Sequence, residues 1–183
     1  MLRGSVCKVT LLGDGAVGKT ALRDRFMGKQ FKANYMATIG AGFATKTVEI
    51  GDEKQPIKFQ IWDLAGQPRF QVVREMYYRG AVGALIVFDI TRKETFDHTV
   101  AWADEIWSKC GKAKVPIVLL GNKIDLREAF PDGITPEDGQ TLAEKLSNGK
   151  FTVPYIETSA KTAENVHRAF TLLGESILDF FRP

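Results

Sequence analysis

A glycine-rich segment between an apolar run and a helical segment constrains the fold of this chain most. The segment Gly13-Asp14-Gly15-Ala16-Val17-Gly18-Lys19-Thr20 fits the pattern G-x-x-x-x-G-K-[ST], with the strand-like run Val6 to Leu12 before it and a helical run, Ala21 to Phe26, after it. A glycine-rich turn that opens a helix presents converging backbone N–H groups and the positive end of the helix dipole. The sequence therefore predicts a phosphate-binding loop, and we expect Gly13 to Ala21 to surround the phosphates.

Two side chains of this loop suggest how the phosphates are held. Lys19 is expected to reach the β and γ phosphates, and the hydroxyl of Thr20 is a hard oxygen ligand suited to Mg²⁺. An alternative is that the glycines serve packing alone, but Lys-Thr at the required place argues against it. The motif by itself does not separate GTP from ATP.

The remaining apolar runs alternate with helical segments and predict an α/β fold with a mostly parallel sheet. Strands are expected within Val6–Leu12, Ile57–Ile61, Ala81–Phe88, Val115–Leu120 and Phe151–Ile156. An apolar stripe near the end of the chain predicts a helix that packs on the sheet, with partner binding as the less favoured alternative; it consists of Val166, Phe170, Leu173, Ile177 and Phe180. We expect one domain that spans residues 1–183.

Composition narrows the environment and the partners. The net charge of +3 comes without basic runs, so no nucleic-acid surface is expected. Cys7 and Cys110 are the only cysteines, too few for a disulfide framework, and the chain has no signal-peptide pattern or run long enough to span a membrane. We therefore expect a cytoplasmic protein. His98 and His167 are interpreted as surface residues on helices, without a catalytic role.

Two later loops predict the choice of base. Asn122-Lys123-Ile124-Asp125 follows the run Val115–Leu120, at the sheet edge where parallel strands present ligands. A carboxylate accepts only, so Asp125 suits the two adjacent donors of guanine and not adenine, and Lys123 can lay its methylenes against one face of the base. Glu157-Thr158-Ser159-Ala160-Lys161 strengthens this interpretation over that of an ordinary solvated loop.

In this order, these segments resemble the Ras superfamily of small GTPases from Lys8 to Phe180. The Rab branch is the most similar one, on Ile39–Phe43, Ile61–Gln67, Tyr77–Ala81 and Phe88–Thr91. The resemblance implies a P-loop NTPase G domain with a mostly parallel six-stranded sheet and helices on both faces. It also implies a switch that binds GTP or GDP with Mg²⁺, hydrolyses GTP slowly and acts in regulation of the membrane-traffic type.

The resemblance further implies roles for single residues. Phe31 would pack edge-on against the base, Asn122 would brace the base loop against the phosphate loop, and Ala160 would donate its N–H to guanine O6. Thr38 would ligate Mg²⁺ beside Thr20 and sense the γ phosphate, and Asp63 would hold the metal through a water. Gln67 would orient the attacking water, with Gly66, Lys19 and Thr38 completing the catalytic set, and Ser159 and Lys161 would complete the nucleotide site.

Several positions depart from the family pattern. Leu64 stands where most relatives have Thr, and Pro68 stands where many have Glu. Pro68 is expected to bias Gln67 towards an extended backbone. The chain ends at Phe181-Arg182-Pro183 without the cysteines that carry prenyl groups in Rab proteins, so association with the cytoplasmic face of membranes is expected only through a longer, lipid-bearing tail.

Partners follow from the same resemblance: a GTPase-activating protein, a nucleotide exchange factor and effectors. Trp62, Phe43 and Tyr78 are expected close together as an apolar partner surface, with core packing of Trp62 equally open. Two other functions compete with the switch. A scaffold that holds nucleotide without cycling is disfavoured because Lys19, Thr20, Thr38, Asp63, Gly66 and Gln67 are all present, and an ATP-dependent enzyme is disfavoured by Asp125.

Overall fold

Six strands form one sheet in the computed structural model, which describes residues 6–33, 38–111, 114–147 and 152–182. The strands are β1 (Val6–Leu12), β2 (Ala41–Ile50), β3 (Gln55–Leu64), β4 (Gly83–Asp89), β5 (Ile117–Asn122) and β6 (Tyr155–Thr158). They lie in the order β2-β3-β1-β4-β5-β6, and β2 pairs antiparallel with β3 while the other pairs are parallel. The predicted α/β class and mostly parallel sheet are confirmed.

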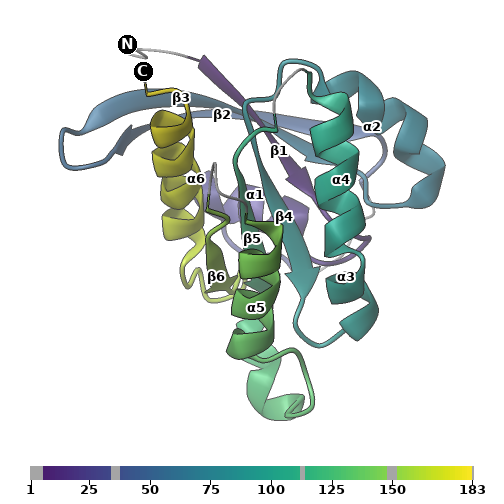
Figure 1. Ribbon diagram of the computed structural model, residues 1–183. Helices are drawn as coiled ribbons and strands as arrows, with labels where there is room; N and C mark the ends of the chain where they lie inside the picture. The colour runs from purple at the N-terminus through teal and green to yellow at the C-terminus, as the bar shows by residue number, and fades with distance from the viewer. Residues whose placement is uncertain (1–5, 34–37, 112–113, 148–151, 183) are drawn as a thin grey trace.

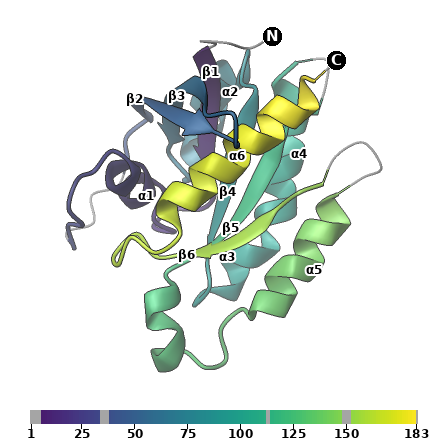
Figure 2. The same ribbon diagram turned by 90° about the vertical axis from the view of Figure 1, so that its left-hand side faces the viewer.

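Helices cover both faces of this sheet. They are α1 (Lys19–Phe26), α2 (Gln71–Tyr78), α3 (Lys93–Asp97), α4 (Thr99–Lys109), α5 (Pro136–Leu146) and α6 (Val166–Phe180), with short 3₁₀ turns η1 (Pro68–Phe70) and η2 (Ile124–Ala129). Figure 1 shows α6 and α4 on opposite sides of the sheet, and in Figure 2 α6 crosses the near face. Among the described residues, no helix combines the length and the apolar composition that crossing a bilayer requires.

Strand β4 explains why two cores form. Leu85 and Val87 pack with α1 and α6 in one buried cluster, whereas Ala84, Ile86 and Phe88 pack with α4 and α5 in the other. Successive side chains of a strand point to opposite faces, so a strand covered on both sides is apolar throughout. The predicted stripe of α6 is confirmed: Val166, Phe170, Leu173 and Ile177 are buried, and Phe180 at its end is partly buried.

Three expectations about strands need correction. The expected run Phe151–Ile156 gives a strand only from Tyr155, and Phe151 lies outside the described residues. Likewise β5 begins after Pro116 and not at Val115. Both strands start directly after a proline, which has no N–H to donate to a neighbouring strand. The periodicity also missed β2, because only Val48 and Ile50 of this edge strand are buried.

Candidate functional site

The loop between β1 and α1 has a backbone that requires glycine at two positions. Gly13 has φ +132°, and a Cβ there would lie 2.1 Å from the carbonyl oxygen of Val87. Gly18 has φ +105°, and a Cβ there would lie 2.3 Å from Nδ2 of Asn122. Because side chains at such φ values are strained and would collide with neighbours, these glycines let the loop pack against two strand ends.

A cavity of 790 Å³ opens beside this loop at the carboxyl ends of the strands, where ligands bind in open α/β sheets. Most of the predicted site residues line it, from six separate stretches of the chain: Gly15, Ala16, Gly18, Lys19, Thr20, Ala21, Phe31, Thr38, Gly66, Gln67, Asn122, Lys123, Asp125, Ala160 and Lys161. The structure thus brings together residues up to 146 positions apart, from Gly15 to Lys161.

Lys19 is the buried cation of the cavity. Its Nζ donates to the carbonyl oxygens of Gly13 and Asp14, at 2.6 Å each. Burial lowers the pKa of the Lys19 ammonium to about 8, although the nearby carboxylates of Asp63 and Asp14 oppose this effect. A buried ammonium held by two carbonyls at the mouth of a helix is suited to an anionic ligand with several oxygens.

A cluster of oxygen atoms from three elements lies next to Lys19. The Thr20 hydroxyl donates to Oδ2 of Asp63 at 2.5 Å and lies 2.9 Å from the Thr38 hydroxyl oxygen. Asp63 is fully buried, and burial raises the pKa of its carboxyl above the ordinary value despite the Thr20 hydrogen bond and the charges of Arg23 and Lys19. Oδ1 of Asp63 has no hydrogen-bond partner within the described ranges.

This cluster fits a magnesium ion. Two hydroxyls and a carboxylate supply only oxygen atoms, which are the ligands that Mg²⁺ prefers. The buried Oδ1 of Asp63 is an acceptor that a cation, or a water molecule on it, would satisfy. Thr20, Thr38 and Asp63 are the residues that would hold the ion.

The two loops that are predicted to read the base are tied to the loop between β1 and α1 through Asn122. Its Nδ2 donates to the carbonyl oxygen of Val17 at 2.8 Å, while its Oδ1 accepts from the hydroxyl of Thr158 at 3.1 Å and from the backbone N–H of Ala160 at 3.3 Å. Asn122 is almost fully buried. One side chain therefore links three loops that carry predicted site residues.

Asp125 and Lys123 are held by their own partners. The Ser159 hydroxyl donates to Oδ1 of Asp125 at 2.6 Å, and Nζ of Lys161 lies 4.0 Å from its Oδ2. Lys123 has φ +72°, and its Nζ lies 2.6 Å from Oδ2 of Asp89. Lys123 thereby runs along the cavity wall with its charge fixed, which leaves its methylenes for contact with a flat ligand.

Gly66 and Gln67 approach the phosphate loop from the end of β3. A Cβ on Gly66 would lie 2.3 Å from the carbonyl oxygen of Gly13, so only glycine permits this approach. Gln67 has φ −75° and ψ 140°, an extended backbone directly before Pro68. Gln67 thus has the extended backbone that was predicted, in keeping with the rule that a proline disfavours the α region for the residue before it.

A layer of side chains that the sequence did not reveal supports these loops from outside. Nη1 of Arg74 donates to the carbonyl oxygens of Ala65 and Gln67 at 3.1 and 2.9 Å, on either side of Gly66. Its guanidinium lies over the ring of Trp102, 4.5 Å from the centroid. The sequence contains only a weak indication that Arg74 is buried, because Val72, Val73 and Met76 on the same helix are apolar. In the structure these three side chains are exposed, and the charged Arg74 is buried.

The phosphate loop is also held by α4. Asp14 Oδ1 accepts from Nε1 of Trp102 at 2.8 Å, and Oδ2 lies 2.7 Å from Nδ1 of His98. Arg92 donates to the carbonyl oxygen of Gly15 at 2.9 Å. The prediction that His98 lies within a helix is wrong, because the residue occupies the turn between α3 and α4. The Asp14 carboxylate raises the pKa of the His98 imidazole.

The predicted aromatic group is partly wrong. The Trp62 ring lies 4.8 Å from the ring of Phe43 and 4.9 Å from that of Tyr77, as centroid distances. Tyr78 is fully buried instead, and its hydroxyl donates to Glu105 at 2.7 Å. Neighbouring residues of a helix face different directions, so moving the prediction by one residue exchanges the surface for the core.

Comparisons with known proteins agree with the geometry. A family model described as the Ras family matches residues 8–179. Ras-related protein RABA4b of Arabidopsis thaliana is 45% identical over 94% of this chain and 72% of its own length. Ras-related protein Rab11A of Lotus japonicus is 44% identical over 91% of this chain and 69% of its own length. GTP-binding protein yptV5 of Volvox carteri is 40% identical over 94% of this chain and 82% of its own length.

A family match of this extent, together with relatives of 40–45% identity, shows both the family and the reaction class. The chain belongs to the Ras family and is a small GTPase of the Rab branch.

Proposed function

We propose that residues 1–183 form one G domain that binds GTP or GDP with Mg²⁺ and signals through two loops that contact the γ phosphate. The observation that carries this proposal is the single cavity shared by Lys19, the hydroxyls of Thr20 and Thr38, and the base-reading Asp125. A nucleoside-triphosphate site requires groups that bind the phosphates, the metal and the base to line the same cavity.

In this proposal the chain's own residues bind and orient the nucleotide. The loop Gly13 to Ala21 donates backbone N–H groups to the phosphates, and Lys19 binds the β and γ phosphates. Asp125 accepts from guanine, Lys123 lays its methylenes against one face of the base, and Phe31 packs edge-on against the base. Ala160, Ser159 and Lys161 complete the base site. Bound Mg²⁺ supplies neutralisation of the charge that develops on the phosphate oxygens.

Hydrolysis and switching use the two loops on either side of the phosphates. Gln67 orients the attacking water, while Thr38 and the N–H of Gly66 contact the γ phosphate. Loss of that phosphate removes contacts from both loops, which then relax. Effectors that bind only the ordered loops therefore distinguish the GTP form from the GDP form.

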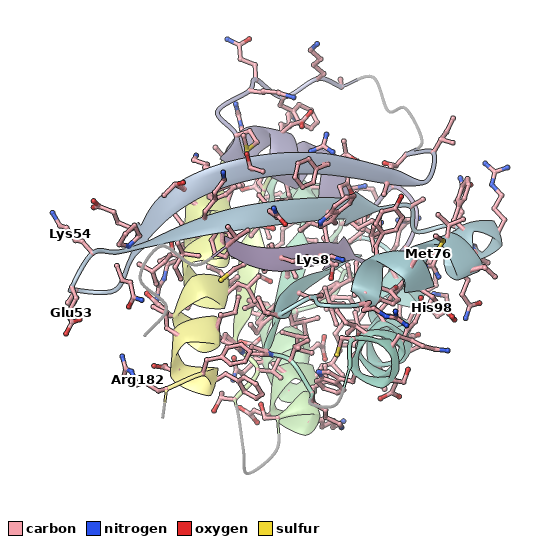
Figure 3. All side chains as sticks on the ribbon, turned by 90° about the horizontal axis from the view of Figure 1, so that it is seen from above. Lys8, Glu53, Lys54, Met76, His98 and Arg182 are labelled. Carbon is pink, nitrogen blue, oxygen red and sulfur yellow. The ribbon has the colours of Figure 1, made fainter. Side chains whose placement is uncertain are left out.

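An apolar surface beside these loops supports binding of protein partners. The rings of Phe43, Trp62 and Tyr77 lie against one another, and the segments next to them, α2 and the residues before β2, carry exposed apolar side chains: Ile39, Val72, Val73 and Met76. Met76 points outward from α2 in Figure 3. Exposed apolar patches of this kind mark interaction sites. We assign this surface to an effector, an exchange factor and an activating protein, in a cytoplasmic, Rab-type role in membrane traffic.

Tryptophan fluorescence tests the switch. Trp62 directly precedes Asp63 and packs against the rings of Phe43 and Tyr77, so its emission is expected to differ between GDP and a non-hydrolysable GTP analogue. The variant Trp62→Phe is expected to lose most of that difference. Trp107→Phe is the matched control, because the indole N–H of Trp107 donates to Val115, away from the cavity residues. Identical spectra of the parent with both nucleotides would contradict a moving second switch.

A further inference from the structure

Arg23, on α1, is a cation that neither the phosphate site nor the base site uses. Its Nε and Nη2 donate to Oδ1 of Asp24 at 3.0 and 2.8 Å, and its Nη1 donates to Oδ2 of Asp63 at 3.3 Å. The Arg23 side chain is only 14% exposed. Two carboxylates therefore hold the guanidinium in one position, against the carboxylate assigned to the metal.

Asp63 has few other charge partners. The charged groups facing it are Arg23 and Lys19, which favour its ionised form, and Asp24, which opposes it. Among the residues that the structure describes, Arg23 alone forms a direct ion pair with Asp63, since Nζ of Lys19 donates to two backbone carbonyls. Because Asp63 is fully buried, its charge needs compensation from the protein or from a bound cation. Arg23 supplies part of this compensation.

The neighbouring strand leaves room for this arrangement. Gly42 on β2 is the register partner of Asp63 on β3, and a Cβ on Gly42 would lie 2.2 Å from Nη1 of Arg23. Gly42 does not have a positive φ, so its backbone alone does not call for glycine. What the missing side chain provides is the space into which the guanidinium fits.

We propose that Arg23 is a built-in counter-ion of Asp63 that weakens the binding of Mg²⁺ and thereby speeds the release of GDP. A carboxylate already paired with a guanidinium gains less from a second cation, and the two positive charges repel each other. Arg23 acts through Asp63 and is a tuning residue, with no contact to the nucleotide assigned to it. The inference rests on the proposed function, because it requires a nucleotide site that uses Mg²⁺.

The test measures release of a fluorescent GDP analogue from the full chain as the Mg²⁺ concentration is varied. In Arg23→Leu, the Mg²⁺ concentration that half-maximally slows release is expected to fall about tenfold, the size expected for one hydrogen bond to a charged group. Arg23→Lys keeps the charge and should remain close to the parent. Arg168→Leu removes the same charge from an exposed pair with Glu175 on α6 and should leave the half-maximal concentration unchanged.

A second variant moves the guanidinium without removing it. Gly42→Ala places a methyl group 2.2 Å from Nη1 of Arg23, so the guanidinium has to move and the same shift towards lower Mg²⁺ concentration is expected. This variant decides the matter if Arg23→Leu does not fold. Equal half-maximal concentrations in the parent and in Arg23→Leu, or in the parent and Gly42→Ala in that case, would overturn the proposal. A parent that does not bind the GDP analogue at all would instead overturn the proposed function.

Discussion

Replacing Asp125 by asparagine is expected to change the preferred nucleotide from guanine to xanthine. The carboxylate only accepts, and guanine presents two adjacent donors, N1–H and the 2-amino group. Xanthine has a carbonyl in place of that amino group, which calls for a donor. The Ser159 hydroxyl donates to Oδ1 of Asp125 at 2.6 Å. In Asp125→Asn the amide oxygen can accept this hydrogen bond, which turns the amide NH₂ of the new side chain towards the base.

The expected effect is large, because a mismatch leaves buried polar groups unpaired on both sides. Sites built on such hydrogen bonds discriminate by about 10⁴ or more. Competition between GDP and xanthosine diphosphate for the site measures the change. Asp132→Asn removes the same charge from an exposed loop nearby and should keep the guanine preference. If Asp125→Asn still favours GDP over xanthosine diphosphate, the base-reading role of this residue is wrong.

Hydrolysis of GTP by the protein alone is expected to take many minutes or longer. The charge that develops on the transferred phosphoryl group needs a cation, and an arginine there contributes about 10³ to 10⁵ in rate. Within the described part of the chain no arginine lines the cavity, since Arg23, Arg74 and Arg92 are held by carboxylates and carbonyls around it. GTPases with a built-in arginine place it three residues before the threonine that corresponds to Thr38. In this chain the position is Tyr35, which lies outside the described residues.

Single-turnover hydrolysis, followed by chromatography of GTP and GDP, measures this rate. Gln67→Leu should slow it further, because leucine cannot orient water. Pro68→Ala and Pro68→Glu should raise it, since Gln67 is then no longer biased towards φ −75° and ψ 140°. A parent that converts its bound GTP within seconds without a partner would show that an arginine acts in cis. Unchanged rates in both Pro68 variants would remove only the argument about backbone stiffness.

The features that could be predicted from the sequence are those that depend on residues close together in the chain. The motif Gly13 to Thr20 needs its glycines for backbone reasons that any chain shares, so its place between β1 and α1 was predictable. The apolar runs of β4 and β5 reflect cover on both faces, and the stripe of α6 reflects cover on one. Periodicity identifies such segments because burial repeats with the geometry of the element.

The features that could not be predicted from the sequence depend on contacts between distant residues or on small differences in helix orientation. Arg74 contacts the carbonyls of Ala65 and Gln67 because the fold places α2 next to the residues that follow β3. No spacing of residues in the sequence indicates this contact. Arg23 on α1 fits beside Gly42 on β2 and contacts Asp63 on β3, so three elements have to meet before the match exists. Tyr77 and Tyr78 are neighbours of the same type, and their exchange of surface for core follows from the exact phase of a helix of eight residues.

The most direct test of the central claim is to identify the nucleotide that purified protein carries. The protein is denatured after purification in Mg²⁺, and the released small molecules are separated by chromatography and quantified against protein. We expect guanine nucleotide, GDP with a smaller share of GTP, at about one molecule per chain, because the site combines Lys19, Thr20 and Asp125 in one cavity. Adenine nucleotide in its place, or a chain that carries none and takes up no GDP when it is added, would contradict the account.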